Sequence, residues 1–335
     1  MYPWQTLQWQ QITQRSVLPH ALLLRGRAGI GKHAFATELS KSLLCPAPNQ
    51  TIACGICPSC LWFNENNHPD YRVISPEDAD NGSEASLEVP KLETLKKKTT
   101  KKSQISVSQI RALSDYLSLS NHQVNGRRIV LISPAETLNI ASANALLKML
   151  EEPPSNTLFL LVSSQPQRLL PTITSRCQAV DMMLPARSET LEWLNEQGVS
   201  NAQACLDYAS GAPLIALQIA TDNDTTTNLI KALALGGKLD PFMLAPSFLK
   251  VGMERAIDIM QKWIFDVTAY KLTRKLHYHT QYANALQALA NSVNLVLLLN
   301  FQKMLGDAKL IANHPLNNQL QLENLLSHYT LIFNG

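Results

Sequence analysis

Four cysteines in one short segment are the residues with the clearest chemical meaning. Cys45, Cys54, Cys57 and Cys60 are four of the six cysteines in the chain. Four thiolates at such close spacing are typical of a closed tetrahedral Zn(II) site, which stabilises its segment and has no open position for catalysis. Four reduced cysteines packed in a core are the alternative. We predict a structural zinc module over residues 45–60.

A glycine-rich stretch, RGRAGIGKHAF, follows the apolar run ALLL. Gly26, Gly29, Gly31 and Lys32 match a phosphate-binding loop, in which backbone N–H groups surround a phosphate and the lysine reaches the outer phosphates. A Ser or Thr then binds magnesium in the full pattern. His33 takes that place here, and imidazole is a poor ligand for a cation that prefers oxygen. Either the loop binds a nucleotide weakly, or it is vestigial and Lys32 is merely solvated.

The residues that should activate the attacking water are also missing. ATPases of this kind carry an aspartate and a glutamate at the end of a strand, here RIVLIS at 128–133. The chain has Ser133 and Pro134 at this point, and neither can hold a metal-bound water as a carboxylate does. Glu136 is interpreted as a first-turn helix residue that the helix dipole favours. Two independent losses affect the same chemistry, so we expect negligible ATP hydrolysis.

Arg176, in the sequence Ser-Arg-Cys, precedes the last predicted strand. An arginine at the rim of a sheet domain can reach a nucleotide on a neighbouring subunit. In NTPases such an arginine, supplied in trans, stabilises the transferring phosphoryl group and is worth about 10³–10⁵ in rate. The alternative is that Arg176 caps a helix end or pairs with a nearby carboxylate.

The elements that must position these residues alternate between short apolar runs and helical patterns in the first half of the chain. This alternation predicts a parallel sheet with helices on both faces. From about residue 183 only helical patterns remain, broken by Gly, Pro and Asn-rich turns. The expected strands are 21–25, 71–75, 128–133, 158–163 and 178–182, with helices over 31–44, 106–119, 135–151 and 166–175.

Composition limits the function classes. The chain has 335 residues, 45% hydrophobic and 16% charged, with a net charge of +3, as in a folded globular protein. Neither a signal peptide nor a membrane-spanning run is apparent, so we expect a cytosolic protein. Residues 76–104 run from an acidic stretch to KKKTTKK, which predicts a solvated loop. Contact of its lysines with DNA or a partner is the alternative.

Taken together, these motifs resemble clamp-loader subunits of the AAA+ family. LEEPP and SRC together with the cysteine insert are the specific part of this resemblance, and the glycine loop alone is not. The matching stretches are HALLLRGRAGIGK (20–32), the insert, NHPDY (67–71), NALLKMLEEPP (144–154), NTLFLLVSSQPQRLLPTITSRC (156–177) and NHPLNNQLQLENLL (313–326).

The resemblance implies a RecA-like α/β AAA+ domain over 1–182 with a five-stranded parallel sheet and the zinc module. A small helical lid over 183–224 and an all-α collar for oligomerisation over 225–335 would follow. It also implies zinc ligation by the four cysteines and a role of Arg176 as the trans arginine finger. Family ATPases carry a sensor arginine in the lid, where this chain has Leu214. The implied subunit is therefore a non-hydrolysing stator.

The resemblance also implies partners. These are the delta subunit and the gamma/tau ATPase subunits of the DNA polymerase III clamp loader and, through the complex, the beta sliding clamp and primed DNA. The place is the cytoplasmic, nucleoid-associated replisome, without a membrane. The polymerase activity would belong to the holoenzyme, and we expect neither ATPase nor polymerase activity from this chain.

Two rival functions remain. An ATP-hydrolysing motor subunit of the gamma/tau type requires carboxylates that positions 133–134 lack. A zinc-dependent DNA-binding protein would bind DNA alone in a salt-sensitive manner, which the near-neutral charge disfavours.

Overall fold

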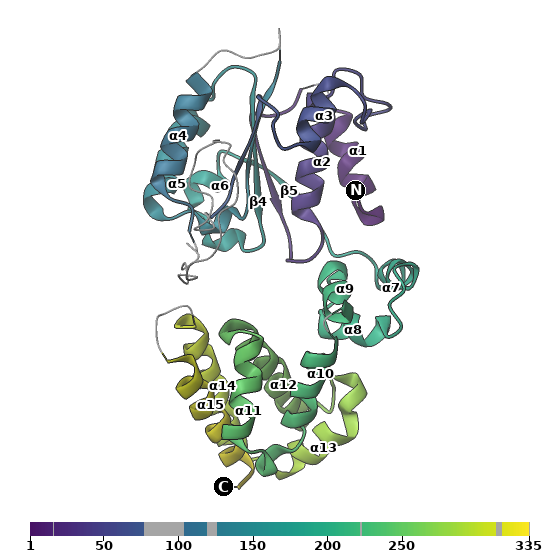
Figure 1. Cartoon of the computed structure of the whole chain (residues 1–335), viewed down its shortest axis with the longest axis vertical. Helices are drawn as coiled ribbons and strands as arrows, with labels where there is room; N and C mark the ends of the chain where they lie inside the picture. Colours follow the sequence, from purple (N-terminus) through teal and green to yellow (C-terminus); the bar gives the residue numbers. More distant parts are fainter. Residues whose placement is uncertain (16, 77–103, 119–125, 222, 313–316, 335) are drawn as a thin grey trace, which may run out of the picture. The chain divides into compact units, whose positions relative to one another are not determined.

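The computed structural model describes residues 1–15, 17–76, 104–118, 126–221, 223–312 and 317–334 (Figure 1). The chain divides into two compact units, Met1–Leu184 and Pro185–Gly335. The charged insert predicted over 76–104, with KKKTTKK, lies outside the described residues except at its two ends. The separation of the second unit into a lid and a collar stays a prediction.

A five-stranded sheet forms the centre of the first unit. The strands are β1 (Ala21–Arg25), β2 (Tyr71–Ile74), β3 (Arg128–Ile132), β4 (Thr157–Ser163) and β5 (Gln178–Asp181). They lie in the order β2-β3-β4-β1-β5, and every pairing is parallel. Strands β3 and β4 are buried along their whole length, because helices cover both faces of a parallel sheet. The predicted parallel sheet is confirmed.

Two groups of helices cover the two faces of the sheet, as Figure 1 shows. One face packs against α1 (Thr6–Thr13), α2 (Lys32–Leu44) and α3 (Pro58–Asn64), with Trp9 and Phe35 in its core. The other packs against α4 (Val107–Ser118), α5 (Ile140–Glu151) and α6 (Pro171–Thr174). The 3-10 helices are η1 (Pro3–Gln5), η2 (Ala135–Thr137) and η3 (Pro166–Arg168).

The second unit is helical. Its longest helix, α12 (Met253–Thr273), carries Trp263, which is fully buried and donates its Nε1–H to the hydroxyl of Tyr329 at 2.9 Å. The other elements are α7 (Arg187–Glu196), α8 (Ala202–Tyr208), α9 (Pro213–Thr221), α10 (Asn223–Leu233), η4 (Gly236–Lys238), α11 (Pro241–Lys250), η5 (Thr280–Tyr282), α13 (Ala283–Ser292), α14 (Leu295–Leu310) and α15 (Asn318–Asn334).

The buried carboxylate of Asp266 stabilises the turn that follows α12. Asp266 accepts hydrogen bonds from the backbone N–H groups of His277, Tyr278 and His279. Its Oδ2 also lies 2.9 Å from Nδ1 of the His279 ring. Burial opposes ionisation of Asp266, but these hydrogen bonds prevail and lower its pKa. The carboxylate therefore organises the turn that leads to η5 and α13.

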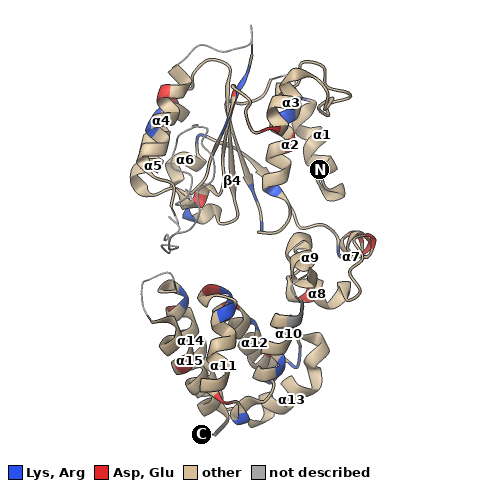
Figure 2. Ribbon diagram, in the orientation of Figure 1, with Lys and Arg blue, Asp and Glu red and all other residues tan. Residues whose placement is uncertain are grey.

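Charged residues of both signs are interspersed over the helices of each unit in Figure 2, consistent with the net charge of +3. Within the described ranges, no single helix is both long and apolar enough to cross a membrane. Thr280–Ser292 and Leu295–Leu310 satisfy that test only as a pair, bent by 115°.

Candidate functional site

The glycine loop connects the carboxyl end of β1 to the start of α2. Gly29 and Gly31 have φ of 79° and 86°, in the left-handed region that favours glycine. Gly26 is required for a different reason, since a Cβ there would lie 2.2 Å from the carbonyl oxygen of Met182. The three glycines thus allow the tight path that the sequence predicted.

The ammonium group of Lys32 is bound by other groups of the same chain. Its side chain is buried, and Nζ donates to the carbonyl oxygen of Arg27 at 2.6 Å and to the hydroxyl of Ser164 at 3.0 Å. Burial lowers the pKa of the Lys32 ammonium to about 8, against the attraction of the Glu136 carboxylate. Its hydrogen bonds go to the loop itself and to the end of β4.

Glu136 belongs to this site, which the sequence analysis missed. It lies in η2, just after β3, and its Oε1 accepts the backbone N–H of Ser164 at 3.0 Å. Its Oε2 is buried and makes no hydrogen bond within the described part of the chain. The interpretation of Glu136 as a plain first-turn helix residue is therefore incomplete. The carboxyl ends of parallel strands meet at one edge of a sheet, and this was the available signal.

Ser133 and His33, which replace the metal-binding residues of an ATPase, lie at the end of β3 and in the first turn of α2. Ser133 directly follows β3, and its backbone N–H donates to the carbonyl of Ile74. The exposed His33 ring lies beside Thr37, one turn further along α2, with Nδ1 3.4 Å from Oγ1. Ser163 uses its hydroxyl to accept the backbone N–H of Gln165. Glu136 is a carboxylate that acts on Lys32, and its Oε1 already accepts the backbone N–H of Ser164.

The N-terminal segment covers the glycine loop, which the sequence did not predict. Gln5 is buried, and its Nε2 donates to the carbonyls of Ile30 and Gly31, each at 3.0 Å. The indole of Trp4 donates to Ile30 as well, and it stacks on the Tyr2 ring at 5.1 Å between centroids. The loop is therefore held in its conformation by its own chain.

Arg176 lies at the opposite edge of the sheet from this loop. It follows α6 and precedes β5 by one residue, and β5 runs parallel to β1. The loop follows the carboxyl end of β1, so the arginine is at the amino edge and the loop at the carboxyl edge. The structure brings the loop, Lys32, Ser164 and Glu136 together, but it does not bring Arg176 to them.

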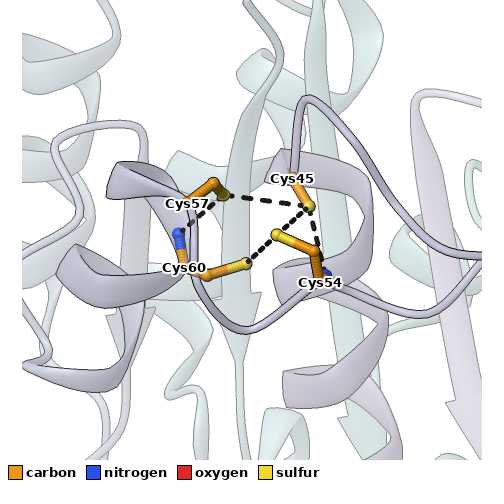
Figure 3. A group of neighbouring side chains, drawn as sticks. All are labelled: Cys45, Cys54, Cys57 and Cys60. Atoms are coloured by element: carbon orange, nitrogen blue, oxygen red, sulfur yellow. Dashed lines mark hydrogen bonds between the residues drawn. The ribbon is translucent and has the colours of Figure 1, made fainter.

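The sulfur atoms of the four cysteines that the sequence predicted as metal ligands all lie within 4.8 Å of one another (Figure 3). Cys45 follows α2, Cys54 and Cys57 lie in the following loop, and Cys60 lies in the first turn of α3. The Sγ atoms of Cys45 and Cys54, Cys45 and Cys57, and Cys54 and Cys60 are 3.6, 3.9 and 4.0 Å apart. Sulfurs at 2.3 Å from a tetrahedral zinc are separated by about 3.8 Å. The cluster therefore has the dimensions of a zinc site.

Backbone N–H groups support the thiolates. Cys54 N–H points at the sulfur of Cys45 and Cys60 N–H at that of Cys57, both at 3.4 Å. The backbone around Ile56 lowers the pKa of Cys54 to about 6, whereas burial raises the pKa of Cys60 to about 12. Binding of a metal must therefore displace the Cys60 proton. The four cysteines thus form a group that can hold a metal ion, and its identity as a structural Zn(II) stays a prediction.

The chain has relatives among known families and proteins. It matches the family described as "DNA polymerase III, delta subunit" over residues 3–185 and "DNA polymerase III, delta subunit, C terminal" over 224–330. It is 36% identical to DNA polymerase III subunit delta' of Pseudomonas aeruginosa over 82% of this chain and 79% of that protein. Subunit delta' of Haemophilus influenzae is 29% identical over 85% and 81%.

Among solved structures, the chain resembles a DNA polymerase III gamma subunit-related protein of Thermotoga maritima. The TM-score is 0.50 at 18% identity, with 99% of each chain covered. At this identity the likeness concerns the fold alone, and it agrees with the predicted AAA+ architecture.

Proposed function

Because the chain belongs to the DNA polymerase III delta-prime subunit family, we propose that it is the non-hydrolysing stator of the clamp loader. In this function it supplies Arg176 to ATP bound by the adjacent subunit while the sliding clamp is loaded onto primed DNA. Its place is the cytoplasmic replisome. Its partners are the delta subunit and the gamma/tau ATPases and, through the complex, the beta clamp.

One observation carries this proposal: Arg176 and the glycine loop lie at opposite edges of one parallel sheet. The guanidinium cannot serve a nucleotide on its own chain, so a nucleotide within its reach must belong to a neighbour. The hydrogen bonds of Lys32 to Arg27 and Ser164 also support a loop without turnover, as do the residues at 33, 133 and 134.

The zinc module in this proposal is structural, because its four positions are all sulfur and leave no open position for a substrate. The metal would be held by Cys45, Cys54, Cys57 and Cys60. When bound, it supplies a cross-link between the end of α2 and the start of α3. It takes no part in nucleotide chemistry.

Assembly through residues 225–335 is part of the proposal. Phe242 and Met243 on α11, with Val296 and Leu299 on α14, are exposed apolar side chains that partner subunits could cover. Leu298 and Leu305 are fully buried in the unit's own core. The apolar face of α14 is thus divided between folding and a surface available for contact.

Arg176→Ala in the reconstituted clamp loader tests the proposal. We expect slower DNA-stimulated ATP turnover with unchanged assembly, because a trans arginine contributes about 10³–10⁵ in rate at the site it completes. Arg15→Ala is the matched control, since Arg15 is bound to Gln178, the first residue of β5, at the same edge. Turnover unaffected by Arg176→Ala would remove the finger role.

The buried Oε2 atom of Glu136 favours one alternative, an ATP-hydrolysing motor subunit of the gamma/tau type. This atom has no hydrogen-bond partner among the residues that the structure describes, and its carboxylate acts on Lys32. That function requires phosphate release by the purified chain with ATP and magnesium, abolished by Lys32→Ala. We expect none.

A further inference from the structure

The side chain of Arg176 contacts three groups of its own chain. Its Nη2 lies 2.7 Å from Oε1 of Glu151, the last residue of α5. Its Nη1 donates to the carbonyl oxygen of Thr172 at 3.0 Å and to the hydroxyl of Ser175 at 3.5 Å. The whole side chain of Arg176 is 35% exposed, so it is accessible from outside while these contacts restrain its orientation.

The backbone that carries the arginine is fixed on both sides. Ile173 is fully buried, and Cys177 is 8% exposed within the same core cluster. Ser175 directly follows α6, and its hydroxyl donates to the carbonyl oxygen of Thr172, which also accepts from the guanidinium. The backbone at Arg176 is therefore fixed by buried neighbours on both sides. Only the side-chain rotamers of Arg176 are left to vary.

The position of Glu151 is unfavourable for an acid on general grounds. A carboxylate at the C-terminal end of a helix faces the negative end of the helix dipole. An exposed ion pair also contributes little to folding. Glu151 is therefore expected to contribute little to the stability of the fold. Its contact with Arg176 gives an acid at this position a different role. Glu152, the next residue, has no ion pair within the described part of the chain.

The contacts leave the arginine able to bind a phosphoryl group. A guanidinium has five N–H donors in a fixed plane. Nη2 contacts Glu151 and Nη1 contacts both Thr172 and Ser175, whereas Nε–H makes no hydrogen bond within the described residues. Fixing the plane in advance reduces the rotamer freedom lost when a phosphate oxygen binds, and so favours the reactive geometry.

We propose that Glu151 is the positioning residue of Arg176 and orients its guanidinium for a neighbouring subunit's ATP. This inference rests on the proposed trans function of Arg176. Glu151 touches neither the nucleotide nor the reacting atoms. It acts through the arginine, and its effect therefore requires the arginine.

The test measures DNA-stimulated ATP hydrolysis by the reconstituted clamp loader with Glu151→Gln, Arg176→Ala and the double variant. Glu151→Gln should lower kcat about 10- to 100-fold at the completed site, as expected for a misplaced catalytic group, with little change in KM. In the Arg176→Ala background it should have no further effect. Glu152→Gln is the matched control and should behave as the unchanged complex, and gel filtration reports assembly.

Three results would overturn the inference alone. These are unchanged kcat for Glu151→Gln when Arg176→Ala slows hydrolysis, a loss that adds fully to that of Arg176→Ala, or an equal loss in Glu152→Gln. If Arg176→Ala itself has no effect, the proposed function fails, and the role of Glu151 fails with it.

Discussion

The hydroxyl of Ser59 lies 2.8 Å from Nε2 of His68, and both side chains are almost completely buried. Ser59 lies between Cys57 and Cys60, and its hydroxyl donates to the carbonyl of Leu44, which precedes Cys45. The backbone N–H of Asp70 donates to Nδ1 of His68. His68 thus links the cysteine cluster to the start of β2 without being a metal ligand.

Replacement of His68 by Ala should weaken zinc retention. Loss of a residue that orients metal ligands typically costs 10–100-fold in metal affinity. Zinc release to a chromogenic chelator, measured well below the unfolding temperature, gives the rate. His68→Gln, which keeps a side-chain N–H, should recover part of the loss, and the exposed His20→Ala should release zinc as the unchanged protein does. Equal release from His68→Ala would show that this link does not support the site.

The buried Lys32 predicts a pH dependence of stability. The folded-state pKa of about 8 is below the ordinary value of 10.5. Between these values the unfolded chain binds a proton that the folded chain does not. The free energy of unfolding of the wild type should therefore rise with pH, relative to Lys32→Met, from about pH 8 to 10.5.

Denaturant unfolding at pH 7, 8.5 and 10 measures this difference. The exposed Lys148→Met serves as the control, and its difference from the wild type should change little over the same range. A constant difference between the wild type and Lys32→Met would contradict the burial of a charged ammonium.

Gly31→Ala should destabilise the first unit for two separable reasons. The left-handed φ of 86° costs a non-glycine residue about 1–2 kcal/mol. The new Cβ would also lie 2.5 Å from the Tyr2 ring, and overlap of this kind typically costs 1–3 kcal/mol. The added Cβ would also lie 2.9 Å from Nε2 of Gln5, so the combination with Tyr2→Ala should remove only the part of the second cost that the ring causes.

Thermal unfolding of the single and double variants, with Tyr2→Ala alone, measures the coupling. Gly198→Ala isolates the backbone cost, because Gly198 has φ of 78° and no atom within 4 Å of the added Cβ. Simple additivity of Gly31→Ala and Tyr2→Ala would mean that the ring does not cover the loop.

Local patterns were sufficient to predict the five strands and the cysteine cluster. β1 was predicted at 21–25, where it is found, because a strand buried on both faces is a continuous apolar run between turn signals. The cysteines fall within one short segment, so their convergence needed little knowledge of the rest of the fold. The glycine loop was likewise a local pattern between a strand and a helix.

Contacts between distant segments could not be predicted in the same way. Glu136 meets Ser164, and Glu151 meets Arg176, only because the strand order places their elements together. The contact of Gln5 with the glycine loop has no periodicity or spacing to reveal it. Side chains that couple one motif to another were thus the part that needed the structure.

Parallel strands also give the first unit a direction. The glycine loop lies at the carboxyl edge of the sheet and Arg176 at the amino edge. A row in which each subunit presents its arginine to the loop of the next would therefore have two different ends. In the proposed function, a subunit whose own N-terminal segment contacts its glycine loop supplies Arg176 to the next subunit but needs no arginine from another one. If the proposed function holds, such a subunit would stand at one end of the row.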